Sequence, residues 1–166
     1  MAQRKAVKAK IDRLDVRLMS SLAEHGRKSI TELSKNIALS PTPLSARLDR
    51  LEAEQLILGY RADVDVEKLA TLDVYYVTLG IKGFSADTMR RIEALMAENP
   101  YIVAVDCLFG SIDYVMLVYA KSKQHYHEIL APFLQFELDY QTLPVSRRLI
   151  RFHLHRLIAE LGRDFE

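Results

Sequence analysis

Two prolines at positions 41 and 43 constrain this chain more than any other feature, because they allow a helix to start at only one place. The segment from Leu39 to Tyr60 reads "LSPTPLSARLDRLEAEQLILGY". Pro41 at the first helical position loses no hydrogen bond, since the first N–H groups of a helix have no intrahelical partner. Ser40 is expected to accept a hydrogen bond from the first turn. The sequence therefore predicts a helix that begins abruptly at Pro41, with Pro43 in its first turn.

The predicted helix has one apolar face and one small, polar face. Leu44, Leu48 and Leu51 share a stripe at spacings of four and three residues, which is typical of a face that packs on a core. The residues expected to point directly away are Thr42, Ala46, Asp49 and Ala53. A helix with a small, hydroxylated tip suits a DNA major groove, where arginines further along reach base edges or phosphates.

Two apolar-periodic segments precede this helix. "IDRLDVRLMSSLAEHG" has Gly26 placed to end a helix in the left-handed conformation. "SITELSKNIAL" opens with Ser29 and Glu32, a capping-box pair. Three helices with a tight turn before the third predict a helix-turn-helix with a support helix. The following "LILGYRADVD" is expected to form a short wing or linker strand that carries Arg61.

Charge divides unevenly along the chain. Residues 1–61 carry twelve Lys and Arg against seven Asp and Glu, whereas residues 62–166 carry eleven against fifteen. The basic part is expected to meet a polyanion. The alternative is that three amphipathic helices form a small bundle without any role in DNA binding.

Composition limits the kinds of site and the cellular compartments that fit this chain. Cys107 is the only cysteine, which excludes a disulfide framework and a thiolate zinc cluster; the residue itself is expected to be buried in a strand. No apolar run reaches the length of a membrane span. Residues 1–10, "MAQRKAVKAK", are predicted to be a disordered basic arm and not a signal peptide. We expect a cytoplasmic protein without a membrane partner.

The remainder of the chain predicts a second, α+β module. After a linker at 62–73, the expected order is strand 74–82, a helix that is capped by Ser85 and stops before Pro100, strands 101–109 and 113–121, helix 122–138 and strand 140–152. This β-α-β-β-α-β order is the ferredoxin-like arrangement. Pro132 is expected to kink or divide its helix, and Pro144 to place its strand on a sheet edge. Residues 154–166 predict a C-terminal helix.

The chain resembles the Lrp/AsnC (leucine-responsive, feast/famine) transcription regulators in its "LSPTP" turn, its R-L-x-R-L-E run and its closing I-x-G-Y. The resemblance extends over nearly the whole chain from Ile11. It implies a winged helix-turn-helix at 11–61 and a βαββαβ effector-binding and oligomerisation domain, of the RAM type, at 74–153. It also implies dimers assembled into octamers that bend or wrap double-stranded DNA.

A regulator of this kind would place the helix that starts at Pro41 in the major groove. Thr42, Ser45 and Arg50 are then predicted nearest the bases, while the remaining arginines and Lys28 mainly meet phosphates. The predicted DNA-binding residues are Arg27, Lys28, Ser40, Thr42, Pro43, Ser45, Arg47, Arg50 and Arg61.

The resemblance further implies an amino-acid effector at the hairpin between the second and third strands. The matching residues are Gly110, Ser111, Ile112, Asp113 and Tyr114, preceded by Phe109. Backbone N–H groups at a glycine turn can receive a carboxylate, and Asp113 would hold an amine or cap the turn. Phe109 and Ser111 depart from the small hydroxyl and acidic residues that are common in the family. They predict a closed or altered pocket, and a plain hairpin turn is the alternative.

No catalytic set or metal site is predicted. His125 with His127, and His153 with His155, are each two residues apart, a spacing that points side chains to different faces of a helix. We expect no enzyme, no cofactor and no metal. Two alternatives to an effector-controlled regulator stay open: an architectural DNA-binding regulator without an effector, and a ferredoxin-like domain that binds or converts a small molecule.

Overall fold

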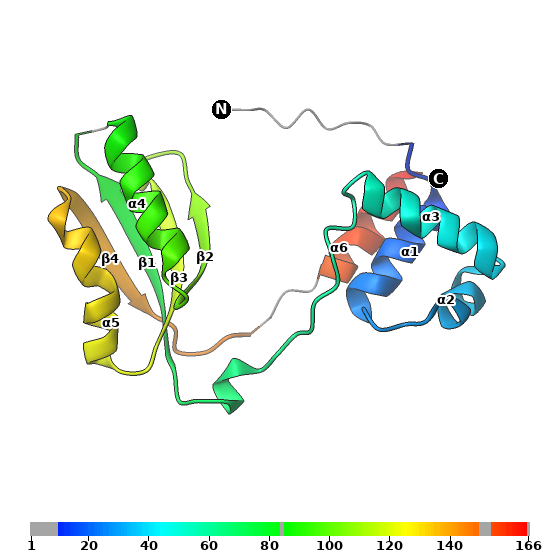
Figure 1. The fold of residues 1–166 in the computed structure, drawn as a ribbon, viewed down its shortest axis with the longest axis horizontal. Coiled ribbons are helices and arrows are strands. Elements are labelled where there is room, and N and C mark those ends of the chain that lie inside the picture. The colour runs from blue at the N-terminus through cyan, green and yellow to red at the C-terminus, as the bar shows by residue number, and fades with distance from the viewer. Residues whose placement is uncertain (1–9, 84, 150–153, 166) are drawn as a thin grey trace. The chain divides into compact units, whose positions relative to one another are not determined.

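The computed structural model describes residues 10–83, 85–149 and 154–165 (Figure 1). They form two compact units. One contains the described residues of Met1–Asp63 and of Ile150–Glu166, and the other is Val64–Leu149. The predicted basic arm lies outside the described residues except for Lys10, and so does His153.

Three short helices build most of the first unit: α1 (Arg13–Glu24), α2 (Ile30–Ile37) and α3 (Pro41–Ala53). The Ser29–Glu32 capping box that begins α2 is confirmed, and Asp12 with Asp15 forms a second one at the start of α1. The core between the helices consists of Leu18, Leu22, Leu33, Ile37, Leu44 and Leu51. The apolar stripe predicted for α3 therefore faces this core.

The helix α3 begins at Pro41 as predicted, but its cap differs from the prediction. Ser40 has the extended backbone of a cap residue, yet its side chain accepts no hydrogen bond from the first turn. A capping hydroxyl normally accepts from the second or third helical N–H, and the third residue here is Pro43, which has none. The expectation for the Ser40 side chain was wrong because the second proline removes the donor.

Left-handed residues occur at helix ends where no glycine is present. Gly26 does not end α1, whose cap is His25 with a φ of −142°, so that prediction was wrong. Instead Ala38 has a φ of 60° in the tight turn between α2 and α3. The Leu39 N–H then donates to the Ser34 carbonyl at 3.3 Å, which closes α2.

The predicted wing strand is absent from the described residues between α3 and Asp73. Gln55 is left-handed, with a φ of 56°, and the Leu56 N–H donates to the Leu51 carbonyl at 2.9 Å. This is a helix-ending Schellman turn, not the start of a hairpin. The Tyr60 hydroxyl then donates to Glu52 Oε1 at 2.6 Å, and burial together with this carboxylate raises the pKa of Tyr60 to about 12. The segment thus folds back on α3, and a one-turn helix, η1 (Val66–Lys68), follows.

The second unit has the predicted ferredoxin-like topology. Its elements are β1 (Asp73–Ile81), α4 (Ala86–Glu98), β2 (Ile102–Cys107), β3 (Tyr114–Ala120), α5 (Lys123–Leu130), η2 (Ala131–Gln135) and β4 (Leu138–Pro144). The strands pair antiparallel in the order β2-β3-β1-β4. Both α4 and α5 lie on the same side of the sheet (Figure 1). Fully buried side chains of β1, β3 and α4, such as Val77, Met116 and Ile92, fill the space between the layers.

The prolines of this unit act as expected. The helix α5 ends at Leu130, and Pro132 lies in the tighter η2 helix that follows, so the predicted division is confirmed. Pro144 ends the edge strand β4. The strand was predicted to continue to residue 152, which is wrong for the described residues 145–149. The Val145 N–H still donates to the Val74 carbonyl at 2.8 Å, after which the chain leaves the sheet, and Arg148 Nη1 donates to the Tyr119 hydroxyl at 2.7 Å.

Two further expectations have opposite outcomes. Cys107 is exposed and not buried, because it ends the edge strand β2, of which only Ile102 is buried. The C-terminal helix is confirmed as α6 (Leu154–Leu161), followed by η3 (Gly162–Phe165). This helix belongs to the first unit and packs against α1.

Candidate DNA-binding surface and effector loop

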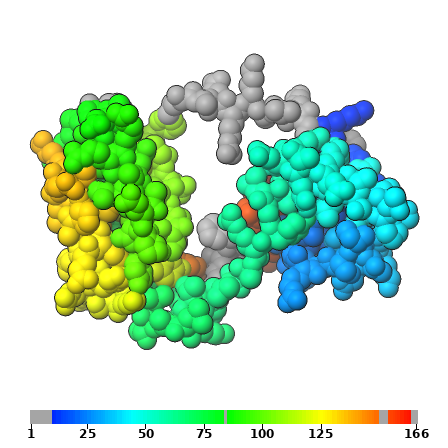
Figure 2. All heavy atoms as spheres, viewed as in Figure 1, coloured from blue at the N-terminus to red at the C-terminus, as the bar shows by residue number. Residues whose placement is uncertain are grey.

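The outer face of α3 is exposed as the periodicity predicts. Thr42, Ala46, Asp49 and Ala53 are exposed, and Ser45 is half-buried at the edge of this face. The helix lies at the surface of its unit in the space-filling view, where it is cyan (Figure 2). Because these side chains are short, the helix can approach a groove closely.

The two arginines of α3 bind a carboxylate that the sequence reasoning did not pair with them. Arg47 Nη1 lies 2.8 Å from Asp15 Oδ1, and Arg50 Nη2 lies 2.5 Å from Asp15 Oδ2. The Asp15 side chain has no exposed surface, whereas the two arginine side chains are 26% and 33% exposed. Arg47 also reaches Asp12 at 2.6 Å. Both guanidinium groups therefore tie α3 to the start of α1.

The electrostatics of this cluster favour the charged forms. Burial of Asp15 favours its neutral form, but hydrogen bonds from Arg50, the Asp12 backbone and Arg47 outweigh burial and lower its pKa. Hydrogen bonds to Asp12 and then Asp15 raise the pKa of Arg47, and the bond to Asp15 raises the pKa of Arg50. A signal for this site was present in the sequence, because Asp15 falls on the apolar stripe of Leu14, Leu18 and Leu22. A carboxylate on a buried stripe needs a cationic partner.

The other predicted DNA contacts differ in their surroundings. Arg27, Ser40 and Arg61 are exposed, and Pro43 is exposed beside Thr42. Lys28 is half-buried, and its ammonium donates to Ser21 Oγ at 3.0 Å. These residues remain predicted contacts.

The loop between β2 and β3 is held by Asp113. Its Oδ2 accepts the Ile81 N–H at 2.7 Å, while its own N–H donates to the Leu79 carbonyl at 2.8 Å. The Asp113 side chain thus bonds the backbone of the neighbouring strand β1 and does not cap its own turn. Gly110 has a φ of 135°, and Phe109 is 87% exposed. The loop therefore presents a phenyl ring outward while its carboxylate is bound to β1.

Tyr114 lies beneath this loop and not on its surface. It is 2% exposed, and its hydroxyl donates to Glu93 Oε1 at 2.8 Å. Burial, followed by the effect of Glu93, raises its pKa. Gly80 was missed by the sequence reasoning, although a glycine inside a strand often marks a close backbone approach. A Cβ there would lie 2.9 Å from the Ser111 carbonyl oxygen.

The described residues contain no cluster of three or more His, Cys, Asp or Glu able to hold a metal ion. Within the same residues, no helix combines the length and apolar character needed to cross a membrane.

Of the paired histidines, His125 has a local backbone partner, because its Nδ1 accepts the Lys121 N–H at 3.1 Å.

Both halves of the chain match known families. Residues 11–57 match the winged helix-turn-helix DNA-binding family, and residues 74–151 match the Lrp/AsnC ligand binding domain. The Bkd operon transcriptional regulator of Pseudomonas aeruginosa is 31% identical over 122 residues, which span 74% of this chain and 80% of that protein. The leucine-responsive regulatory protein of Haemophilus influenzae is 28% identical over 124 residues, 75% of each chain.

Solved structures share the fold. A Neisseria meningitidis transcriptional regulator in complex with L-methionine has a TM-score of 0.78 at 24% identity, covering 85% of this chain and 93% of that one. B. subtilis LrpC has a TM-score of 0.78 at 22% identity, with coverages of 87% and 100%. The helix-turn-helix, the βαββαβ sheet and these relatives all indicate the same family. The chain belongs to the Lrp/AsnC family of DNA-binding transcription regulators, which are not enzymes.

Proposed function

We propose that this regulator binds chromosomal DNA in the cytoplasm with the N-terminal half of α3 in the major groove. The observation that carries this is the short, exposed outer face of a helix whose start is set by Pro41 and Pro43. Thr42, Pro43 and Ser45 lie nearest the bases in this arrangement. Ser40, Arg27, Lys28 and Arg61 meet the phosphate backbone, which dominates affinity without reading sequence.

Arg47 and Arg50 take a different part in this proposal from the one the sequence suggested. Both guanidinium groups bind Asp15, and Arg50 Nη1 also donates to the Lys10 carbonyl at 3.1 Å. Their main effect is then to hold α3 at its angle to α1. The alternative is that Arg50, which is one-third exposed, leaves Asp15 and reaches a base edge.

One experiment distinguishes a structural role of Arg50 from a contact with a base. An operator selected from a random duplex pool would be titrated with the wild type, Thr42→Ala and Arg50→Ala, and each variant would also be unfolded with urea. We expect Thr42→Ala to weaken operator binding by about 1 kcal/mol without loss of stability. Arg50→Ala should lose stability while it keeps its preference for operator over random DNA. A relaxed preference of roughly 1–3 kcal/mol at unchanged stability would assign Arg50 to a base.

The protein is further proposed to act as dimers that assemble into octamers. On the sheet face opposite α4 and α5, the cross-strand neighbours Tyr76 and Leu117 lie beside Leu143. Tyr76 and Leu143 are 42% and 43% exposed. A dimer would read half-sites separated by one helical turn or a multiple of it. Light scattering of Leu143→Glu is expected to show a smaller assembly than the wild type; an unchanged mass would remove this face from the interface.

An amino acid or related metabolite is the proposed effector, acting at the loop that contains Gly110. Support comes from the match of residues 74–151 to a ligand-binding domain and from the methionine complex of a structural relative. Thermal melts with each of the twenty amino acids test this. A ligand at 100 times its Kd should stabilise by about 2.7 kcal/mol. Phe109→Ser should strengthen a weak response if the phenyl ring narrows the site. No response in either protein would favour an architectural regulator without an effector.

A further inference from the structure

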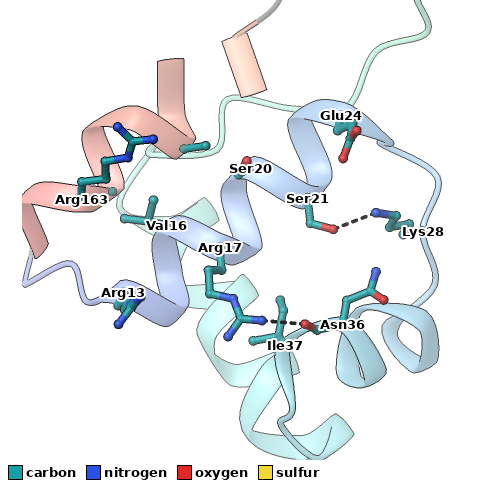
Figure 3. Close-up of a pocket in the computed structure, with 12 residues that line it drawn as sticks. Arg13, Val16, Arg17, Ser20, Ser21, Glu24, Lys28, Asn36, Ile37 and Arg163 are labelled. Carbon is teal, nitrogen blue, oxygen red and sulfur yellow. Dashed lines mark hydrogen bonds between the residues drawn. The ribbon is translucent and has the colours of Figure 1, made fainter. Parts of the chain in front are cut away.

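A cavity of about 450 Å³ lies within the DNA-binding unit, and no residue of α3 lines it (Figure 3). Its walls come from α1, from Lys28 and α2, and from the C-terminal segment that contains Gly162. This size falls in the range of small-molecule sites, about 300–1,000 Å³. Of its lining residues, the functions proposed above use only Lys28.

The charge of the lining is strongly positive. Arg13, Arg17, Lys28 and Arg163 line the cavity together with a single acid, Glu24. Arg17 Nη2 donates to the Asn36 carbonyl at 2.8 Å, and Lys28 Nζ donates to Ser21 Oγ at 3.0 Å. Both acceptors are neutral, so neither bond balances the charge of Arg17 or Lys28, whereas Arg163 Nη1 is paired with Glu160 Oε1 at 2.8 Å on its own segment. An anion with several charged groups complements this lining.

The C-terminal segment lies directly on α1 at this place. A Cβ on Gly162 would overlap Val16 Cγ1, so only a glycine allows this approach. Ser20 Oγ also donates to the His155 carbonyl at 3.2 Å. Ala159, Gly162 and Arg163 form one wall, and therefore the cavity has its full lining only when this segment is docked.

The chemistry of the remaining lining narrows the ligand class. Val16 and Ile37 are 6% and 3% exposed and offer only apolar surface. Ser20, Ser21 and Asn36 add neutral polar groups. The ligand is accordingly small enough for the cavity and carries more than one acidic group on a short carbon frame.

We propose that this cavity binds a small multivalent organic anion, a polycarboxylate or a phosphorylated metabolite, and that the bound anion holds the C-terminal segment on α1. The mechanism is population shift, because a ligand that meets Arg163 only in the docked state favours that state. The proposal does not depend on the effector loop, which lies in the other unit.

Citrate and inorganic phosphate are the probes, each compared with sodium chloride at equal ionic strength in the full-length protein. Hydrogen exchange of peptides from 154–163 is expected to slow with citrate, and calorimetry gives the Kd. Arg17→Gln and Arg163→Gln should each weaken citrate binding by about tenfold or more, as expected for a charge-assisted hydrogen bond. Lys35→Gln, an exposed change on α2 outside the lining, should alter the Kd less than about twofold.

Gly162→Ala provides a variant that leaves the cationic side chains in place. Its added methyl group should displace the segment from Val16 and abolish citrate binding, while exchange in α3 stays as in the wild type. Response to phosphate alone would assign the ligand to phosphorylated compounds. The proposal fails if neither probe slows exchange, if Lys35→Gln weakens binding as much as Arg17→Gln, or if only duplex DNA protects the segment.

Discussion

At the scale of single residues, Asp15 is the side chain on which the DNA-binding unit most depends. It is fully buried, it caps α1 together with Asp12, and it accepts from two arginines of α3. A buried charge is tolerated only when it is paired and hydrogen-bonded. The position of the recognition helix is therefore coupled to one carboxylate.

Asp15→Asn should destabilise the unit. The amide keeps the volume of the carboxylate but leaves Arg47 and Arg50 without their shared charge. Loss of one partner of a buried pair costs about 3–5 kcal/mol, and we expect about 2–3 kcal/mol here because both arginines keep solvent contact. Urea unfolding measures the change. Asp49→Asn on the exposed face of α3 is the control, and an equal loss in that variant would contradict the role of Asp15.

The Asp15 carboxylate also makes the free energy of unfolding depend on pH. Its pKa is lowered in the folded state, below the ordinary value of about 3.9. The stabilisation is thus complete above that value and is lost as the pH falls through the lowered pKa. Unfolding curves between pH 6 and pH 2 should show a loss of stability below about pH 4. In Asp15→Asn the loss of stability that comes from protonating Asp15 should be missing. If the wild type and the variant lose the same stability at low pH, Asp15 is not the cause of the loss.

Gly80 is predicted to be required for the effector loop. An added methyl group would meet the Ser111 carbonyl at 2.9 Å and push the loop away from the Ile81 N–H that Asp113 accepts. Gly80→Ala should destabilise the second unit by about 1–3 kcal/mol. Gly26→Ala, whose new Cβ would lie 3.7 Å from the Leu22 carbonyl oxygen, is the matched control. Thermal unfolding of both variants distinguishes crowding from the general effect of losing a glycine.

At the scale of elements, helix ends decide the geometry of the helix-turn-helix. The α2–α3 turn depends on Ala38 in the left-handed conformation, and α3 ends through a left-handed Gln55. Both conformations are costly for residues with a Cβ. Local sequence signals located the starts of α2, α3 and α4 well, because caps and first-turn prolines act within four residues. They failed at the end of α1, where Gly26 is not the cap, and they did not indicate the left-handed residues Ala38 and Gln55.

Ala38→Gly should therefore stabilise the first unit. Relief of the left-handed strain is expected to exceed the added entropy of the unfolded chain, with a net gain of about 0.5–1 kcal/mol. Ala46→Gly, on the exposed middle of α3, should instead destabilise by about 1 kcal/mol. Chemical denaturation of the two variants gives the sign of each change, and destabilisation by Ala38→Gly would show that this methyl group makes a contact worth more than its strain.

At the scale of the whole molecule, the uneven charge of the sequence corresponds to the two compact units. The basic N-terminal part builds the unit with the helix-turn-helix, and the mildly acidic part builds most of the sheet unit. Contacts with DNA phosphates should then be confined to the first unit. This division predicts which charge changes alter the salt dependence of binding.

If Arg27, Lys28 and Arg61 each meet a phosphate, a dimer makes about six such contacts. The logarithm of affinity should then fall with the logarithm of salt concentration with a slope of about −5. Arg61→Gln should reduce that slope by about 2, since two contacts are lost per dimer. Arg90→Gln, an exposed change on α4, should leave it unaltered. Fluorescence anisotropy with a labelled operator, at salt concentrations between about 50 and 300 mM, measures the slope for each variant.

The sequence by itself determined the element order, the ferredoxin-like topology, the start of α3, the division of α5 at Pro132 and the family. The start of α3 and the division of α5 depend on residues within one helical turn, whereas the family follows from the resemblance of motifs such as "LSPTP". Only the tertiary structure decided the partners of Arg47 and Arg50, the packing of the C-terminal helix on α1 and the bond from Ile81 to Asp113. Arg50 and Asp15 are 35 residues apart, and Ser20 and His155 are 135 apart. Such pairs have no local signature, because packing of the whole core decides which charges and backbone groups meet.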